Sequence, residues 1–212
     1  MTAPSRSARR HDPDRKSRII DVTVDIIAEH GVAGTTHRRI AAAADVPLGS
    51  LTYHFDGLDD LLTQAFRRHA ERMSRSYAAA FAGVRTHDQF VDAVTDLIHS
   101  DADADSRDWA VAYELYLAAL RDPALREVTD SWMRTSRSVL ERFTDPTTAR
   151  GVDALIEGLV MHKVLATTSG ATRSETRDII ARLVPPSSGV TVPSATSSAP
   201  QQPSSRRASP PR

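Results

Sequence analysis

Apolar residues recur every three or four positions over most of the chain, and no segment shows the strict alternation of a half-buried strand. Pairs such as Asp122-Pro123 and Asp145-Pro146 separate the periodic segments, as helix breakers do. The pattern therefore predicts an all-α chain of about nine helices. Their approximate ranges are 14–30, 36–44, 47–55, 58–81, 88–99, 105–121, 124–143, 147–168 and 173–183.

The two ends of the chain differ in composition from the middle. Residues 1–13 are polar and contain proline and arginine, and residues 185–212 are mostly serine, proline, threonine and glutamine. Neither end has the apolar content that offsets the entropy lost on ordering. We expect a disordered arm at 1–13 and a disordered tail at 185–212.

Residues 35–55 carry the most specific pattern, two short helices joined by a tight turn. Thr36, or Thr35, is suited to cap the first helix, and Pro47 fits the first turn of the second. Gly31 follows the last periodic residue of the preceding helix, where a left-handed cap is favoured. A helix-turn-helix of this kind can place its second helix in the major groove of DNA. The helix at 14–30 and this helix-turn-helix together form a three-helix unit, which we call the head. Its expected core is Ile20, Val24, Ile27, Ile40, Ala41, Ala44, Val46, Leu51 and Phe55.

This segment and the helix before it resemble the N-terminal signature of TetR-type transcriptional regulators over residues 15–62. The resemblance implies a helix-turn-helix DNA-binding domain at 14–62 and a helical-bundle domain at 63–184 that binds an effector and dimerises. It also implies a homodimer that reads a palindromic operator. The positions that it places at the DNA are Thr36, Arg38, Leu48, Gly49, Ser50, Thr52, Tyr53 and His54.

The residue types at several of these positions suit that role. Ser50 and Thr52 are short and polar, as contacts to base edges or phosphates require. Tyr53 and His54 can donate to phosphate oxygens while their rings pack on the head. Gly49 has no side chain, so the backbone there can come close to DNA.

Two positions depart from the family pattern. Asp45 stands in the turn where glycine is usual, and aspartate tolerates a left-handed backbone better than most residues. Leu58 stands where a phosphate-contacting lysine is common, so we expect Arg38 or Arg39 to supply that charge.

An aromatic stripe lies in the body of the chain. Trp109, Tyr113 and Tyr116 are spaced i, i+4 and i+7 on one expected helix, and Met133 lies on the next. The stripe is either the core of the bundle or the wall of an apolar pocket, with Glu114, Tyr113 or His162 as polar anchors. The candidate ligand-binding residues are Trp109, Tyr113, Tyr116, Met133 and His162.

The expected helix at 147–168 is apolar on most sides, which is typical of a helix buried on two faces. One face would meet its own bundle and the other a second subunit, together with the helix at 173–183. Ala154 and Gly158, four residues apart, would let two such helices approach closely. The alternative is a central helix in a monomer.

Composition excludes several other classes of protein. The chain has no cysteine, which removes disulfides, thiolate catalysis and cysteine zinc sites. It has no apolar run of about 18 residues and no signal peptide, so we expect a cytoplasmic protein with no membrane partner. No HExxH, GxSxG or glycine-rich phosphate loop is present, and we expect neither catalysis nor a cofactor. We interpret Asp101, Asp103 and Asp105 as a solvated loop rather than a calcium site.

Charge is unevenly distributed although the net charge is zero, because residues 1–55 are mildly basic and residues 56–184 are acidic. This distribution fits DNA contact at one end of the chain. Together with the resemblance to TetR-type regulators, it leads us to expect a ligand-responsive transcriptional repressor that binds a double-stranded DNA operator and responds to an unknown small molecule. The alternative is a helical-bundle enzyme or small-molecule carrier that has lost DNA binding.

Overall fold

The computed structural model describes residues 13–100, 102–166 and 170–186. These residues form helices and no strands, so the predicted all-α fold is confirmed for them. The predicted arm and tail, apart from Pro13 and Pro185–Pro186, lie outside the described residues. The helices are α1 (Arg15–Gly34), α2 (His37–Ala43), α3 (Gly49–His54), α4 (Leu58–Ala80), α5 (His87–His99), α6 (Ala102–Ala119), α7 (Pro123–Leu140), α8 (Pro146–Leu165) and α9 (Arg173–Leu183).

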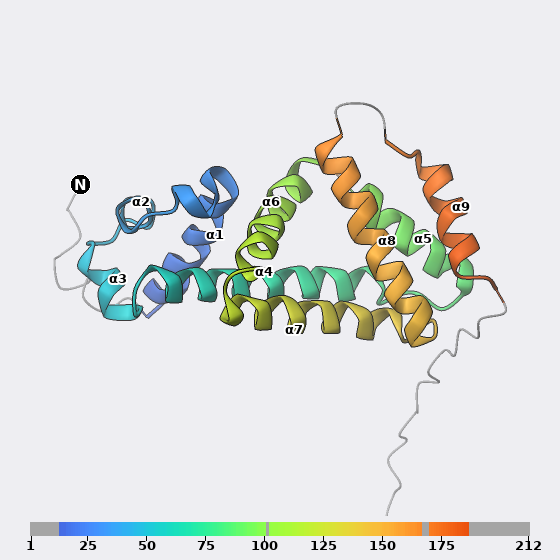
Figure 1. Ribbon diagram of the computed structural model, residues 1–212, viewed down its shortest axis with the longest axis horizontal. Helices are drawn as coiled ribbons and strands as arrows, with labels where there is room; N and C mark the ends of the chain where they lie inside the picture. The colour runs from blue at the N-terminus through green and yellow to red at the C-terminus, as the bar shows by residue number, and fades with distance from the viewer. Residues whose placement is uncertain (1–12, 101, 167–169, 187–212) are drawn as a thin grey trace, which may run out of the picture.

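The helices form a head and a body, and the long helices α4 and α7 contribute to the hydrophobic packing of both. Helices α1, α2 and α3 form the head at one end, and α5, α8 and α9 lie at the other end (Figure 1). Helices α4 and α7 pack side by side along the length of the molecule, and α6 packs against α1, α4 and α7 between the two ends. None of the described helices is both long and apolar enough to cross a membrane.

Local sequence signals explain where most helices begin. Thr36 accepts a hydrogen bond from the Arg39 backbone N–H, as the predicted cap of α2. Thr86 and Thr172 each form a capping box with the side chain three residues later. Asp122 and Asp145 cap α7 and α8, and a proline follows each of them in the first helical turn. The body therefore starts its helices at residues that a sequence can reveal.

Two hydrophobic clusters hold the molecule together. The first joins the head to the beginnings of α4 and α7 and to α6, and includes Ile19, Ile40 and Phe66. The second joins the ends of α4 and α7 to α5, α8 and α9, and includes Phe81 and Phe90. Because the first cluster runs without interruption from the head into the body, a movement of α6 must disturb the packing of α1.

The first aspartates of α6 correct one expectation. Asp103 and Asp105 lie within the first turn of α6 rather than in a solvated loop, and Asp101 lies outside the described residues. The helix predicted at 147–168 ends at Leu165 in the structure.

A break in α1 brings the head into direct contact with α6. Gly31 has φ 66° and ψ 174°, so the predicted positive φ is confirmed, although the helix resumes after it as far as Gly34. The freed backbone N–H of Val32 donates to Glu114 Oε2 at 3.0 Å. A Cβ at position 31 would lie 2.8 Å from Glu114 Oε1.

Replacing this glycine should therefore loosen the contact between head and body. We expect Gly31→Ala to lower the free energy of unfolding by about 1–3 kcal/mol, because the backbone conformation is strained for alanine and the new methyl group displaces Glu114. Urea unfolding measures the change. Gly83→Ala is the control, since its Cβ meets nothing within 4 Å, and equal stability of the two variants would contradict the argument.

Candidate functional site

Helix α3 presents two different faces. Leu51 and Phe55, four residues apart, are buried against the head. The outward face consists of Leu48, which is 50% exposed, Tyr53, which is 83% exposed, and the exposed Gly49 and Thr52. Ser50 and His54 are half-buried at the edge of this face.

Contacts from α1 and from the turn fix the position of α3. The Lys16 ammonium lies 5.5 Å from the centre of the Phe55 ring, which closes the C-terminal end of α3 onto α1. Asp45 adopts φ 50° in the turn, as predicted for the residue that replaces glycine there. Arg18 Nε donates to the carbonyl oxygen of Ala44 at the end of α2. The outward face of α3 is therefore carried on a rigid support.

The predicted DNA-contacting residues lie on α2, on α3 and at their N-caps, and all of them are exposed or half-buried. Thr36 and Arg38, at the start of α2, are exposed like the outward face of α3. The expectation that the Tyr53 ring packs on the head is wrong, because Tyr53 is 83% exposed and its ring meets the His54 ring edge to face at 4.9 Å. A hydroxyl-bearing ring that projects from a rigid helix is available to a partner.

Within the part of the chain that the structure describes, nothing requires residue 49 to be glycine. A Cβ built there meets nothing within 4 Å, and the backbone has no positive φ. The missing side chain leaves the α3 backbone open on its outward face. This observation fits the prediction that another molecule approaches the backbone closely at this point.

The aromatic stripe forms a continuous row of rings inside the body. The Trp109 and Tyr113 rings lie 5.9 Å apart, Tyr113 and Tyr116 lie 6.3 Å apart, and Tyr116 stacks on Trp132 at 5.7 Å. Beyond Trp132, the fully buried His69 meets the indole edge to face at 6.1 Å. Burial lowers the pKa of His69 to about 4, so this ring is neutral.

Two carboxylates of α8 lie beside this row. The Tyr116 hydroxyl donates to Glu157 Oε1 at 2.9 Å, and Arg137 donates to Asp153 at 3.4 Å. Burial, followed by the effect of Glu157, raises the pKa of the Tyr113 hydroxyl to about 12. Burial raises the pKa of Glu157 to about 7, and the Asp153 carboxylate adds to the rise. Glu157 is not among the ligand-binding residues predicted from the sequence.

Three other predicted residues lie apart from this row. Met133 is half-buried on α7 and belongs to neither hydrophobic cluster. His162 is exposed and lines a cavity of about 250 Å³ with residues of α5, α8 and α9. Glu114, considered as a polar anchor, points to the Val32 backbone instead. Trp109, Tyr113 and Tyr116 are the predicted ligand residues that the fold does bring together.

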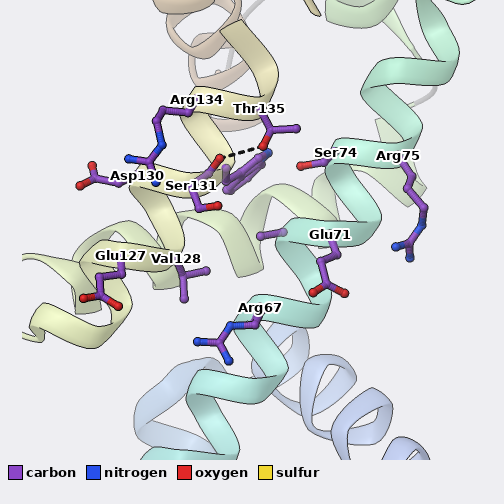
Figure 2. A pocket seen from close by; sticks show the side chains of 12 residues that line it. Arg67, Glu71, Ser74, Arg75, Glu127, Val128, Asp130, Ser131, Arg134 and Thr135 are labelled. Carbon is purple, nitrogen blue, oxygen red and sulfur yellow. Dashed lines mark hydrogen bonds between the residues drawn. The ribbon is translucent and has the colours of Figure 1, made fainter. Parts of the chain in front are cut away.

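A groove of about 680 Å³ runs between α4 and α7 on the outside of the row. Charged side chains from both helices line its rim, including Arg67 and Glu71 from α4 and Glu127 and Arg134 from α7 (Figure 2). Its lining also includes the buried Trp132, the last ring of the row.

Helix α3 is the second helix of the helix-turn-helix, the reading helix that enters the major groove in DNA-binding proteins of this kind. An exposed reading helix on a three-helix head, joined to a helical body that contains buried carboxyl and hydroxyl groups, is the architecture of a helix-turn-helix regulator. Residues 19–65 match the model of bacterial regulatory proteins of the tetR family, and residues 85–186 match that of the tetracyclin repressor-like C-terminal domain. The chain belongs to the TetR family of transcriptional regulators.

Solved structures and curated proteins agree with this assignment. Protein SCO7518 of Streptomyces coelicolor A3(2) is 45% identical, with 81% of this chain and 98% of that chain covered and a TM-score of 0.75. The multidrug binding protein EbrR in complex with ethidium is 39% identical, with coverages of 82% and 100% and a TM-score of 0.68. The transcriptional regulator BetI 1 of Chromohalobacter salexigens is 27% identical over 163 residues, which are 73% of this chain and 81% of that protein.

The open space at Gly49 leads to a prediction about DNA binding. We expect Gly49→Ala to fold as well as the wild type, or to be more stable by up to about 1 kcal/mol, because alanine favours helix. The same variant should bind duplex DNA at least about tenfold more weakly, because the methyl group occupies the approach to the backbone. Fluorescence anisotropy with a labelled duplex measures the affinity. Gly83→Ala is the control, and unchanged affinity of Gly49→Ala would remove Gly49 from the interface.

The raised pKa of Glu157 leads to a prediction about stability. The folded chain holds this proton more tightly than the unfolded chain, in which the pKa is near 4.5. The free energy of unfolding therefore falls as the pH rises from about 4.5 to 7. Replacing the carboxyl by an uncharged amide removes this loss.

We expect Glu157→Gln to raise the free energy of unfolding at pH 8 by up to about 3 kcal/mol, and by much less at pH 5. Urea unfolding at the two pH values tests the difference. Glu141→Gln, which removes an exposed carboxylate at the end of α7, serves as the matched control. A Glu157→Gln variant with no gain at pH 8 would show that the buried carboxylate is not strained.

Proposed function

We propose that the protein is a ligand-responsive transcriptional repressor that binds a palindromic operator as a homodimer. The observation that carries the proposal is the outward face of α3, formed by Leu48, Gly49, Thr52 and Tyr53 and held by buried Leu51 and Phe55. The sign of regulation has one further support, since the transcriptional repressor KstR2 of Rhodococcus jostii is 30% identical over 77 residues. A regulator of this kind acts on chromosomal DNA in the cytoplasm.

The proposed contacts to DNA divide by chemistry. Tyr53, His54 and Arg38 donate to phosphates, which hold the head in register without reading sequence. Ser50 and Thr52 reach base edges in the major groove. In the protein without DNA, the Thr52 hydroxyl donates to the Gly49 carbonyl oxygen at 3.1 Å. Thr52 would exchange this hydrogen bond within α3 for a contact to a base.

The proposed dimer interface is an apolar stripe on α8 and α9. Ala154, Gly158, Met161 and Leu165 follow one another at helical spacing on α8, and all are exposed or half-buried in the single chain. Ile179 and Leu183 of α9, 40% and 38% exposed, extend the apolar surface. Small residues at 154 and 158 would let two copies of α8 approach closely.

The proposed effector site is the interior beside the ring row of Trp109, Tyr113, Tyr116 and Trp132. EbrR, whose whole chain in the ethidium complex matches 82% of this chain, has been solved with ethidium, malachite green and proflavin. By analogy, we propose a planar aromatic molecule as the effector of this chain. Helix α6 carries both the central tyrosines of the row and Glu114, which bonds to the head, and so couples effector to DNA.

Salt-dependent DNA binding tests the function against that of a carrier or enzyme. A regulator's affinity for a duplex should fall steeply with added salt, because phosphate contacts release counterions. Selection from a random duplex library should enrich a palindrome with half-sites roughly 34–36 Å apart. Tyr53→Phe should weaken binding to all duplexes alike, whereas Thr52→Ala should change sequence preference. Salt-independent or absent binding would favour the carrier.

The open space around Gly158 allows a clean test of the dimer. A Cβ at this position meets nothing within 4 Å, so Gly158→Leu should fold but force paired helices apart. We expect monomers in sedimentation at concentrations where the wild type is dimeric. Ala79→Leu, which adds an apolar side chain at an exposed position on α4, should remain dimeric. A wild type that is monomeric at micromolar concentration would reject the interface.

A further inference from the structure

The two carboxylates of α8 differ in their charge compensation. Asp153 accepts from the Arg137 guanidinium at 3.4 Å, which balances its charge. Glu157 accepts only from the Tyr116 hydroxyl, and no cationic side chain of the described residues lies within ion-pair distance of it. The ionised cluster of Glu157, Asp153 and Arg137 therefore carries one uncompensated negative charge in the interior, an arrangement that costs several kcal/mol in proteins.

Polar atoms around this carboxylate also lack partners. The hydroxyls of Tyr77 on α4 and Tyr113 on α6 are buried and form no hydrogen bond within the described part of the chain. The same is true of Nε2 of His69, whose side chain is fully buried behind Trp132. Buried polar atoms are almost always satisfied, so the two tyrosine hydroxyls beside the Glu157 carboxylate indicate a place that accepts a further polar group.

The rings themselves favour one kind of occupant. Electron-rich faces of tryptophan and tyrosine attract organic cations, and the attraction grows when water is excluded. Both tryptophans of the chain, Trp109 and Trp132, belong to this row. Uncharged aromatic ligands would find the same stacking surface but would leave the charge of Glu157 uncompensated.

We propose that the effector is a monovalent aromatic cation, bound among Tyr77, Tyr113 and Tyr116 with the Glu157 carboxylate as its counter-ion. This inference rests on the proposed effector site and specifies its ligand class. The groove between α4 and α7 meets the row at Trp132, which lines the groove and stacks on Tyr116. The oxygen atoms of the Tyr77 and Tyr113 hydroxyls then direct their lone pairs toward the cation.

Binding of the cation is linked to one proton. Protonated Glu157 releases its proton when the cation enters, so the complex contains the carboxylate and the cation, and the proton goes to solvent. The groups that face Glu157 are Tyr77 from α4, Tyr113 and Tyr116 from α6, and Asp153, which is paired with Arg137 from α7. Burial raises the pKa of all three tyrosines, so none of them ionises near neutral pH.

The test uses a permanent cation, 10-methylacridinium, and its uncharged relative acridine, with the full chain at pH 8. Quenching of tryptophan fluorescence reports directly on the site, because both tryptophans lie in the row. We expect the wild type to bind the cation at least tenfold more tightly than acridine. Glu157→Gln should weaken the cation at least tenfold and change acridine by less than twofold, and the Glu141→Gln control should change neither.

The pH dependence gives a second readout. Affinity of the wild type for 10-methylacridinium should fall about tenfold between pH 8 and pH 6, whereas the low affinity of Glu157→Gln should stay constant. Equal affinity for the two probes, equal weakening of both by Glu157→Gln, or no binding of either at millimolar concentration would overturn the inference. Duplex binding measured on the same preparation separates the cases, since DNA binding without cation preference removes this inference and leaves the proposed regulator.

Discussion

The contact between α6 and the break in α1 is the constraint on which the coupling of head and body depends. Val32 donates its backbone N–H to Glu114 at 3.0 Å, and the surrounding hydrophobic cluster is shared by both parts. Tyr113, the residue before Glu114 in α6, belongs to the ring row, and successive residues of a helix point about 100° apart. One helix therefore presents neighbouring side chains to the head and to the interior, and neither contact can shift alone.

The interior of the body lowers the stability of the free protein. Among the described residues, Glu157 has no cationic partner and the hydroxyls of Tyr77 and Tyr113 form no hydrogen bond, where apolar side chains could have packed instead. Local violations of packing rules are expected where function requires them, because the missing interactions are completed by a ligand. The head shows the same principle at Gly49, where a helix-destabilising residue occupies an open position.

The head could be predicted from sequence because its signals are local. Thr36 caps α2 through a hydrogen bond from the backbone of Arg39, only three residues away. Asp45 adopts the positive φ of the turn, and Leu51 and Phe55, four residues apart, lie on one buried face of α3. The site in the body depends on which faces of α4, α6, α7 and α8 meet, and periodicity within one helix does not contain that information. Helical spacing alone therefore allowed His162 as a polar anchor for a ligand, but in the structure it lines a different cavity, with residues of α5, α8 and α9. The feature of the sequence that could have revealed this site is Glu157, an ionisable residue within a helix that is apolar on most sides.

The spacing of the ring row explains how an occupant would act on the head. Neighbouring centres lie 5.7–6.3 Å apart, which is contact distance for aromatic pairs, so a planar ligand must separate two rings before it can stack between them. Separating Tyr116 on α6 from Trp132 on α7 displaces these helices relative to one another. Because Glu114 bonds α6 to Val32, we propose that the displacement reaches α1 and changes the orientation of α3. A ligand that binds only the separated arrangement then shifts the population away from the DNA-bound state, to the extent of its differential affinity.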